Sequence, residues 1–359
     1  MNGKLKIMSS ISWSLRIDEH LQVLWQALAA RKKPGKPGAV RGLLLSENPA
    51  AFAVWDHVFK STVKNRPDFW ERWRNKPLLV VIMRTWVTDK SSGLDLWVRL
   101  LAEHKQRFPQ HRIVMAMNTS TELSLCEEAG IEAVWCNHNA HVDERLYQPL
   151  AGAKAGDARE FDAIYDARFA RYKRNDLAAK VKRLALIHYT APPLFELLWT
   201  LKMRWMLRHG RILNRHRWGV WPVWMNRTAV AASYARARVG LCLSPVEGAM
   251  LASIQYLLCG LPVVTVPSRG GRDDFFDEKN SITVAPDAEA VAAGVRTLIE
   301  RRIDPWVIRA KALSLMAEHQ ARLVVLVDEF QRAHGVPEER LLSNERSTRM
   351  KNGFEDVLG

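Results

Sequence analysis

One loop of this sequence has the residue types of a phosphate-binding turn. The loop follows an apolar run at residues 239–243, which predicts a strand, and it leads into a helix predicted at 251–259. Gly248 frees the backbone just before the helix begins. Unpaired N–H groups at the start of a helix bind anions, and the helix dipole favours a negative charge there. The predicted anion-binding amides are those of Gly248, Ala249, Met250 and Leu251.

Two polar side chains border the same turn. Glu247 lies at the loop tip, where its carboxylate can accept hydrogen bonds from hydroxyl groups. Gln255 lies further along the predicted helix, so its amide can reach the same side of the pocket. The segment therefore predicts a site for a phosphate flanked by hydroxyl groups. The simpler interpretations are an acid stabilised by the helix dipole and a polar group within a helix.

The segment at 244–264 resembles the nucleotide-sugar-binding motif of retaining glycosyltransferases of family 4, which are group 1 transferases with the GT-B fold of two Rossmann-like domains. The residues that fit the motif in register are Ser244, Glu247, Gly248, Gly260, Pro262 and Val263. The residues that depart from it are Pro245, Met250, Gln255 and Tyr256. Gln255 and Tyr256 stand where the family has Glu and Ala. An amide at position 255 can still hydrogen-bond a diol, but without the charge.

Three further segments resemble the same family, in the same order along the chain. They lie at residues 137–149, 162–173 and 267–287. The spacing from Arg168 to Lys173 matches that of two family cations that grip the donor's diphosphate, although Ala167 stands where the family has glycine. Because these cations belong to a longer basic run, a solvated basic face is the simpler interpretation.

The resemblance implies a catalytic group of Glu247, Arg168 and Lys173. Glu247 would contact the donor sugar, and Gln255 would contact the ribose. The two cations, with the amides at 248–251, would stabilise the departing nucleoside diphosphate. No metal ion is expected, and the nucleotide sugar is a substrate rather than a cofactor. Retention in the family needs no protein nucleophile, because the acceptor hydroxyl attacks from the face that the leaving group occupies.

The elements that must position these residues alternate between strand and helix. Apolar runs predict strands at 78–83, 112–117, 132–136, 161–165, 184–187, 239–243, 262–266 and 282–284. Amphipathic patterns predict helices at 94–107, 122–129, 176–182, 194–207, 227–236, 251–259, 287–300 and 305–333. Earlier in the chain, helices are predicted at 21–30 and at 51–64, the second from the spacing of Phe52, Trp55 and Phe59. The alternation predicts an α/β fold with parallel sheets between helices.

A segment rich in Gly and Pro interrupts this alternation at 137–157 and predicts a hinge. The chain then divides into a Rossmann-like acceptor domain at 1–136, a hinge at 137–157, a Rossmann-like nucleotide-sugar domain at 158–335 that ends in a long helix, and a polar tail at 336–359 that we expect to fray. The two domains are expected to face a cleft. The loop from Arg84 to Gly93 is the predicted acceptor site, while His138 and His141 are interpreted as structural histidines.

The composition excludes several classes of protein. The 359 residues include 53 Lys and Arg and 38 Asp and Glu, a net charge of +15, and 48% are hydrophobic, which is too apolar for a disordered chain. Four cysteines without a CxxC pair predict reduced thiols and a cytoplasmic protein; they are Cys126, Cys136, Cys242 and Cys259. The start of the chain lacks the apolar stretch of a signal peptide, and residues 194–207 are too few to cross a bilayer.

Residues 202–218 interleave cations with tryptophans. Such a segment can lie on an anionic leaflet, bind a nucleic-acid backbone or cover an acidic donor. We favour peripheral contact with the inner face of the membrane, because many enzymes resembling this one act on lipid-linked or envelope glycans, and we do not expect a nucleic acid partner.

The sequence therefore predicts a metal-independent, retaining glycosyltransferase. It would move a sugar from a nucleotide-diphosphate donor to a hydroxyl of a cell-surface glycan or glycolipid, such as lipopolysaccharide. Two alternatives stay open. One is a sugar-nucleotide epimerase or a phosphorylase on the same fold. The other is a degenerate transferase that acts as a basic membrane- or nucleic-acid-binding module.

Overall fold

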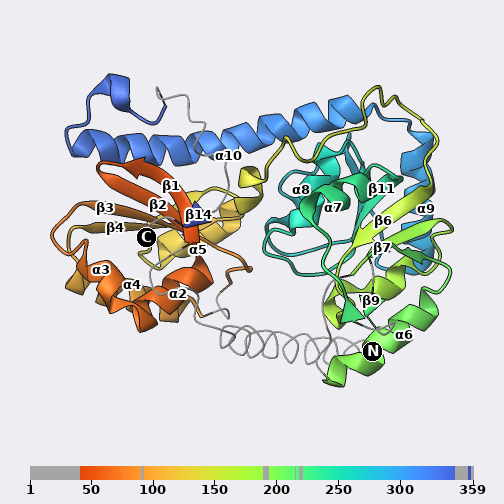
Figure 1. The fold of residues 1–359 in the computed structure, drawn as a ribbon, viewed down its shortest axis with the longest axis horizontal. Coiled ribbons are helices and arrows are strands. Elements are labelled where there is room, and N and C mark those ends of the chain that lie inside the picture. The colour runs from red at the N-terminus through yellow and green to blue at the C-terminus, as the bar shows by residue number, and fades with distance from the viewer. Residues whose placement is uncertain are drawn as a thin grey trace.

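The computed structural model describes residues 41–89, 93–188, 194–214, 216–217, 221–343 and 355–356. These residues form two α/β halves, each built on one sheet, and a long helix runs across both (Figure 1). The helix predicted at 21–30 lies outside the described residues.

The first half is built on a mixed sheet in the order β14-β1-β2-β3-β4-β5. Its strands are β1 (Arg41–Glu47), β2 (Ala50–Trp55), β3 (Leu78–Met83), β4 (His111–Met117), β5 (Ala133–Trp135) and β14 (Glu355–Asp356). Strands β2 to β5 run parallel, whereas β1 is antiparallel to both of its neighbours. Its helices are α2 (Asp56–Asn65), α3 (Pro67–Glu71), α4 (Leu94–Arg107) and α5 (Ser120–Glu128). β3 is buried at every position, as a strand covered on both faces must be.

The second half is built on a parallel sheet in the order β13-β12-β11-β6-β7-β8. Its strands are β6 (Phe161–Asp166), β7 (Leu184–Ile187), β8 (Arg211–Ile212), β11 (Ala237–Cys242), β12 (Val263–Thr265) and β13 (Ser281–Thr283). A separate antiparallel pair consists of β9 (His216–Arg217) and β10 (Trp221–Pro222). Its helices are α6 (Leu194–Met206), α7 (Arg227–Tyr234), α8 (Leu251–Leu258) and α9 (Ala288–Glu300). The chain builds from β6 towards β8 and then returns to β11 on the other side of β6, so the strand order reverses between β6 and β11.

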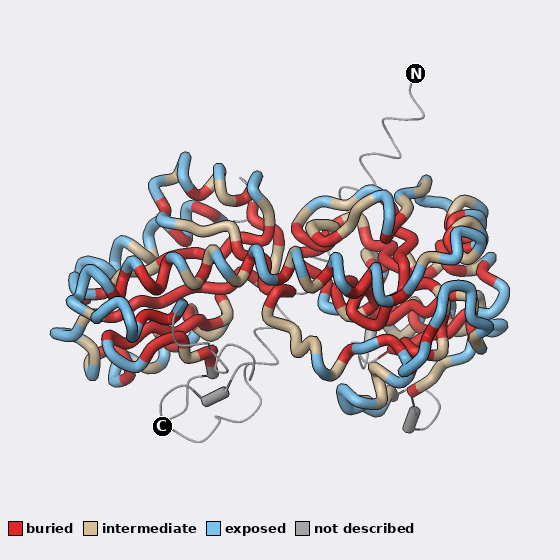
Figure 2. The backbone as a smooth tube through the Cα atoms, turned by 90° about the horizontal axis from the view of Figure 1, so that it is seen from above, coloured by how far each residue is buried: buried red, intermediate tan, exposed pale blue. Residues whose placement is uncertain are grey.

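Helix α10 (Pro305–Ala333) joins the two halves. Pro305 stands in its first turn, and the Asp304 carboxylate accepts the N–H of Trp306 at 2.7 Å. The first part of the helix packs on the core of the second half through Ile308, Ala312 and Met316. The second part packs on the first sheet through Leu323, Val327 and Phe330. Figure 2 shows a buried core in each half, with the exposed residues at the periphery.

Most of the predicted elements are confirmed, and those at 78–83, 94–107, 184–187 and 305–333 agree residue for residue. The helix predicted at 51–64 is wrong in its first part, because Ala50–Trp55 forms strand β2 and only Asp56–Asn65 is helical. A strand buried on both faces lacks the alternation that distinguishes it from a buried helix. The helix predicted at 176–182 is instead a short 3-10 turn, η3 (Asn175–Ala178).

The tail predicted to fray after Gly335 is ordered over the residues described. Leu341 and Leu342 are buried, and Leu342 belongs to the core between α10 and the first sheet. Its N–H donates to the Gln331 side chain at 3.0 Å. Two apolar side chains in a polar tail are enough to dock it, because each removes apolar surface from water.

Candidate functional site

Two charged side chains meet where the loops after β6 and β11 come together. Nζ of Lys173, in η2 (Arg171–Lys173), forms an ion pair with Oε1 of Glu247. Both side chains are buried, with 11% and 6% of their surfaces exposed. The hydroxyl of Ser244 donates to the same carboxylate oxygen at 2.6 Å. The structure thus brings together two of the three predicted catalytic residues at the point where the strand order reverses.

Burial and charge act in opposite directions on Lys173. Burial lowers the pKa of its ammonium, but the negative charge of Glu247 and their hydrogen bond raise the pKa, and the net shift is upward. Since the ordinary pKa of lysine already lies far above neutrality, Lys173 is charged at neutral pH. The hydroxyl of Tyr165, in β6, donates to the carbonyl oxygen of Lys173 and so fixes the turn that carries it.

The third predicted catalytic residue, Arg168, lies beside this pair without contacting Glu247. Its Nε and one terminal nitrogen donate to the hydroxyl of Tyr172 at 3.2 and 3.0 Å. The positive charge of Arg168 lowers the pKa of Lys173 and so opposes the net upward shift. The two cations are therefore close enough to repel each other. Nζ of Lys173 also lies 5.1 Å from the centroid of the Tyr172 ring. Tyr172 lies between the two cations and was missed by the sequence analysis, although it stands next to Lys173.

Gly248 allows the two halves of the molecule to touch at this site. A Cβ atom at Gly248 would lie 2.3 Å from the carbonyl oxygen of Thr85 and 2.9 Å from Cα of Trp86. A Cβ atom at Gly270 would lie 1.8 Å from the carbonyl oxygen of Glu247 and 2.6 Å from Val87. The first part of the predicted acceptor loop, after β3, therefore packs directly on the loop that carries Glu247. Residues 90–92 of that loop lie outside the description.

Buried polar groups hold this part of the acceptor loop in place. The Arg84 guanidinium and the Thr85 hydroxyl each donate to Asp56, both at 2.8 Å. Burial raises the pKa of Asp56, but its contact with His57 and the charge of Arg84 outweigh burial and lower the pKa to about 2. The Glu122 carboxylate accepts the N–H of Thr88 at 2.6 Å. The loop is thus fixed from α2 on one side and from α5 on the other.

Helix α8 begins at Leu251, so the predicted anion-binding amides precede and open it. No side-chain hydrogen bond caps this helix at Met250. Ala249 and Met250 are buried, whereas the Leu251 side chain is exposed. Asn139 donates to the carbonyl oxygen of Met250 at 3.2 Å and so ties the turn to the hinge. The binding of an anion by the amides at the α8 N-terminus stays a prediction.

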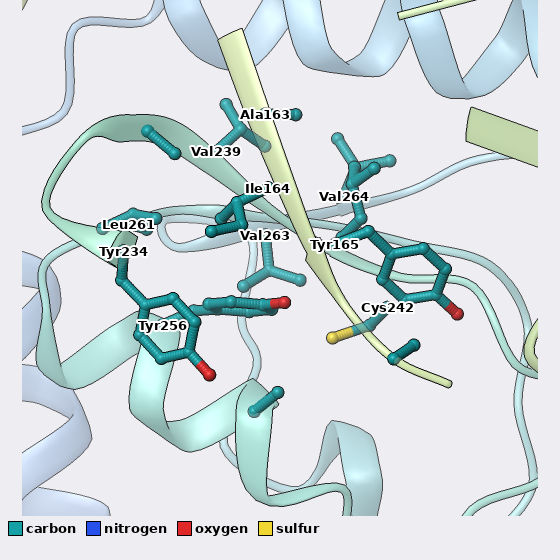
Figure 3. Close-up of a cluster of buried hydrophobic side chains, with 14 of the residues drawn as sticks. Ala163, Ile164, Tyr165, Tyr234, Val239, Cys242, Tyr256, Leu261, Val263 and Val264 are labelled. Atoms are coloured by element: carbon teal, nitrogen blue, oxygen red, sulfur yellow. The ribbon is translucent and has the colours of Figure 1, made fainter. Parts of the chain in front are cut away.

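Gln255 lies in a network of side chains beneath the site. The Tyr234 hydroxyl contacts Oδ2 of Asp166 and lies 3.0 Å from Oε1 of Gln255. The hydroxyl of Tyr256 accepts the N–H of Asp166 at 2.7 Å. Figure 3 shows the two tyrosines in the core below β6, where their ring centroids are 4.8 Å apart. Sequence reasoning missed Asp166 and Tyr234, and the only signal was the position of Asp166 at a strand end.

Tyr256, one of the departures from the family motif, is accommodated by a glycine in β11. A Cβ atom at Gly240 would lie 2.3 Å from Cδ2 of the Tyr256 ring. The ring therefore packs on the bare backbone of β11, and the larger side chain at position 256 is matched by a smaller one opposite. Any side chain at position 240 would therefore overpack the core against Tyr256.

Arg272 is fully buried next to the site but serves the fold. It donates to the carbonyl oxygen of Ser244 at 2.6 Å, to that of Val266 at 2.8 Å and to Asp273 at 2.6 Å. Burial lowers the pKa of Arg272, but the hydrogen bond that it donates to Asp273 and the charge of that carboxylate reverse the shift and raise the pKa. Arg272 thus clamps the loop after β11 to the loop after β12, and Asp273 is its counterion.

The hinge residues connect the two halves and do not belong to the site formed by Lys173, Glu247 and Arg168. Asn137 donates to the carbonyl oxygens of Gly271 at 2.8 Å and of Asn118 at 3.2 Å. His138 is buried and its Nδ1 donates to the carbonyl oxygen of Arg84 at 2.9 Å. Burial lowers the pKa of His141 to about 4, so its ring is neutral at neutral pH. These contacts agree with the interpretation of both histidines as structural.

Neither a metal-ligand cluster nor a membrane-spanning helix occurs among the described residues. In the part of the chain that the structure describes, no cluster of three or more His, Cys, Asp or Glu residues could hold a metal ion. Within the same ranges, no helix is both long enough and apolar enough to cross a membrane. All four cysteines are buried, and none of them forms a disulfide.

Comparisons with known proteins are consistent with this geometry. Residues 215–301, which include the Glu247 loop and α8, match the family model described as Glycosyl transferases group 1. No protein with curated annotation matches the sequence.

Several solved structures share the fold at low sequence identity. A glycosyltransferase from Rickettsia africae is 12% identical with a TM-score of 0.53, covering 79% of this chain and 77% of that one. A sucrose-phosphate synthase from Thermosynechococcus elongatus is 15% identical with a TM-score of 0.51, covering 80% and 74%. HepE from Anabaena, solved in complex with UDP, is 15% identical with a TM-score of 0.50, covering 79% and 77%. The predicted architecture of two Rossmann-like domains is confirmed.

Proposed function

We propose that this chain is a glycosyltransferase of group 1, in line with the family match over residues 215–301 and with the GT-B fold of its structural neighbours. In this proposal it moves a sugar from a nucleoside diphosphate donor to an acceptor hydroxyl with retention and without a metal ion. The observation that carries the proposal is the buried pair of Lys173 and Glu247 at the reversal of strand order in the second sheet. Ligands of open α/β sheets bind at such points. Because HepE was solved with UDP, uridine diphosphate is the first nucleotide to test.

The donor's diphosphate is assigned to the cations and to the N-terminus of α8. Lys173 is charged and already touches Glu247, and Arg168 lies beside it on the Tyr172 hydroxyl. When the diphosphate binds, its negative charge and that of Glu247 share the Lys173 ammonium. Preorganised cations in a buried site stabilise a developing phosphate charge strongly, because little solvent screens them.

The donor sugar is assigned to Glu247. Lys173 and Ser244 both contact Oε1, so the second oxygen, Oε2, is the one we assign to a sugar hydroxyl. A carboxylate that is held by an ammonium and a hydroxyl has its charge neutralised and its orientation fixed. It is therefore better suited to positioning a sugar than to attacking it. Gln255, on the same helix as the anion-binding amides, is assigned to the ribose.

The reaction then needs no covalent intermediate with the protein. The bond between the anomeric carbon and the diphosphate oxygen breaks, and the acceptor oxygen bonds to the same face of that carbon. The acceptor's proton passes to the departing diphosphate oxygen. Arg168 and Lys173 stabilise the charge that remains on the nucleoside diphosphate, and the sugar keeps its anomeric configuration.

The acceptor is assigned to the side of the first half. The loop that carries Thr85, Trp86 and Val87 packs against Gly248 and Gly270, so a substrate held by this loop lies beside the donor sugar. We assign a hydroxyl of a cell-surface glycan or glycolipid as the acceptor. The support for this acceptor class is the segment at 202–218, whose interleaved cations and tryptophans suit an acceptor presented at a membrane.

A donor panel tests the proposed function. The protein is incubated in EDTA with UDP-glucose, UDP-N-acetylglucosamine, GDP-mannose or dTDP-rhamnose and with alkyl glycosides as acceptors. Release of nucleoside diphosphate is quantified, and proton NMR reports the anomeric configuration of the product. The expected result is one productive donor, a retained configuration, and a loss of about 100-fold or more in Glu247→Gln. An inverted product or an absolute need for Mn²⁺ would contradict the mechanism, and interconversion of the donor sugar alone would identify an epimerase.

A further inference from the structure

Helix α6 presents an apolar face to the surface of the molecule. Its inward face carries Thr200 and Met203, which are buried, as is Leu207 directly after the helix. The opposite face carries Leu198, Leu201 and Trp205, which are 76%, 46% and 68% exposed. A surface helix of a globular protein normally directs polar residues outward. Among the described residues, one apolar face of α6 packs on the protein and the other is exposed. The helix lies at the end of the second half that is opposite to α10 (Figure 1).

Cations predominate in this part of the sequence. Helix α6 has one acidic residue, Glu196 in its first turn, and residues 197–226 contain no Asp or Glu. The cations of that range are Lys202, Arg204, Arg208, Arg211, Arg215 and Arg217, of which Arg211 forms an ion pair with Glu160 at 2.6 Å. The Arg208 guanidinium lies 4.9 Å from the centroid of Trp205, and Nζ of Lys202 lies 5.4 Å from that of Trp199. Trp224, in the segment that follows β10, is 73% exposed. The surface thus combines exposed aliphatic and indole groups with cations at their edges.

We propose that the outward face of α6 docks on an anionic lipid bilayer. Leu198, Leu201 and Trp205 would enter the boundary between headgroups and acyl chains, while Lys202 and Arg208 contact lipid phosphates. The charge of the segment is complementary to an anionic leaflet. A nucleic acid fits this face less well, because aliphatic side chains give bases no surface on which to stack.

A contact of Trp199 links helix α6 to the turn that carries Lys173. The Arg171 guanidinium lies 5.7 Å from the ring centroid of Trp199, in α6. Arg171 begins η2, the turn in which Lys173 reaches Glu247. A bilayer that binds α6 would therefore lie beside the turn that carries Lys173. The docking itself does not depend on the proposed transfer reaction and is measured without it.

Vesicle sedimentation with the full chain tests the proposal. The vesicles contain phosphatidylcholine alone or mixed with phosphatidylglycerol. The wild type is expected to sediment with the anionic vesicles and to be released by salt, because the cations contribute to binding. The variant Leu198→Ser/Trp205→Ser removes two apolar side chains and is expected to bind at least about tenfold more weakly. The matched control is Trp306→Ser/Val325→Ser, which changes two exposed apolar residues of α10 and is expected to bind as the wild type does.

Several outcomes would overturn the proposal. They are a wild type that does not sediment with anionic vesicles, equal binding to neutral vesicles, and equal losses in the α6 variant and the α10 control. Binding to single-stranded RNA that is lost in the α6 variant, without vesicle binding, would identify a nucleic acid as the occupant instead. The unfolding temperature and the UDP affinity of both variants, measured without vesicles, confirm that the substitutions act on the surface alone.

Discussion

The ammonium of Lys173 and the carboxylate of Glu247 form a buried ion pair although 74 residues separate them in the sequence. One follows β6 and the other follows β11, and these strands are neighbours in the sheet. The parallel arrangement places both strand ends at the same edge, so the topology alone brings the two loops together. The pair therefore depends on the fold of the second half rather than on any local pattern.

Breaking this ion pair is expected to destabilise the protein. In Lys173→Ala, the Glu247 carboxylate stays buried with Ser244 and without a cation, and loss of one partner of a buried pair costs about 3–5 kcal/mol. The free energy of unfolding, measured by urea denaturation at pH 7, is expected to fall by about this amount. The double variant Lys173→Met/Glu247→Gln removes both charges, so we expect it to regain most of the stability while its transferase activity stays absent. A Lys173→Ala protein as stable as the wild type would show that the pair is not formed in solution.

The contact between the halves at Gly248 is expected to be sensitive to a single methyl group. In Gly248→Ala, the new Cβ would meet the Thr85 carbonyl oxygen at 2.3 Å, which only a shift of backbone can relieve. We expect a loss of about 1–3 kcal/mol in unfolding free energy, as for overpacking in cores, and a lower kcat because the acceptor loop moves. Gly335→Ala is the control, because no described atom lies within 4 Å of the Cβ that the substitution adds. The φ of +75° at this position alone costs the alanine about 1 kcal/mol. An unchanged kcat in Gly248→Ala would show that the loop carrying Thr85 does not take part in the reaction.

Restoring the carboxylate of the family motif at position 255 is expected to weaken the site. Tyr234 has one hydroxyl proton, and donation to the Asp166 carboxylate is the stronger of its two hydrogen bonds. Gln255 can turn its amide so that its NH₂ group donates to the Tyr234 oxygen, whereas a glutamate cannot donate and would repel Asp166. We therefore expect Gln255→Glu to lower the unfolding free energy by about 1 kcal/mol. Calorimetry should also show weaker nucleotide binding than in Gln255→Met, and tighter binding would refute this account of the departure.

Stability is expected to fall as the pH drops below 6.5. Burial, together with the charges of His111 and Arg107, lowers the pKa of His104 from 6.5 to about 3. Between these values the unfolded chain binds a proton that the folded protein does not, so each pH unit costs the folded state about 1.4 kcal/mol from this group. Urea denaturation from pH 7 to pH 4 should show a shallower decline in His104→Gln than in the wild type. Identical slopes would mean that His104 is protonated in the folded protein.

The sequence predicts the strands and helices of the second half well because their apolar runs are short and separated by turns. It fails at Ala50–Trp55, where a strand covered on both faces joins directly to helix α2 and the combined run has a helical spacing. It also cannot show that α10 packs on both halves, because Ile308 and Phe330 lie on one continuous helix. Which half a side chain contacts is decided by tertiary packing alone.

The site could be predicted as far as the local motifs extend. Glu247, Gly248 and Lys173 follow from their segments, and the structure brings them together. Asp166 and Tyr234 could not be found in this way, because their contact joins a strand end to a helix and neither residue belongs to a motif. The match between Gly240 and Tyr256 likewise depends on packing across the sheet and leaves no periodic signal.

The binding of nucleoside diphosphates decides whether Lys173, Glu247 and Arg168 form a donor site. Titration calorimetry of the wild type with UDP, GDP, ADP, dTDP and CMP in EDTA is repeated with Lys173→Ala and Arg168→Ala, with the folded state of each variant checked by its unfolding transition. We expect one nucleoside diphosphate to bind saturably without metal. Its affinity should fall at least about tenfold in both variants, because hydrogen bonds to charged groups contribute about 1.5–3 kcal/mol. A folded wild type that binds none of these nucleotides at millimolar concentration, or variants that bind as tightly as the wild type, would contradict the assignment of Lys173 and Glu247 to a donor site.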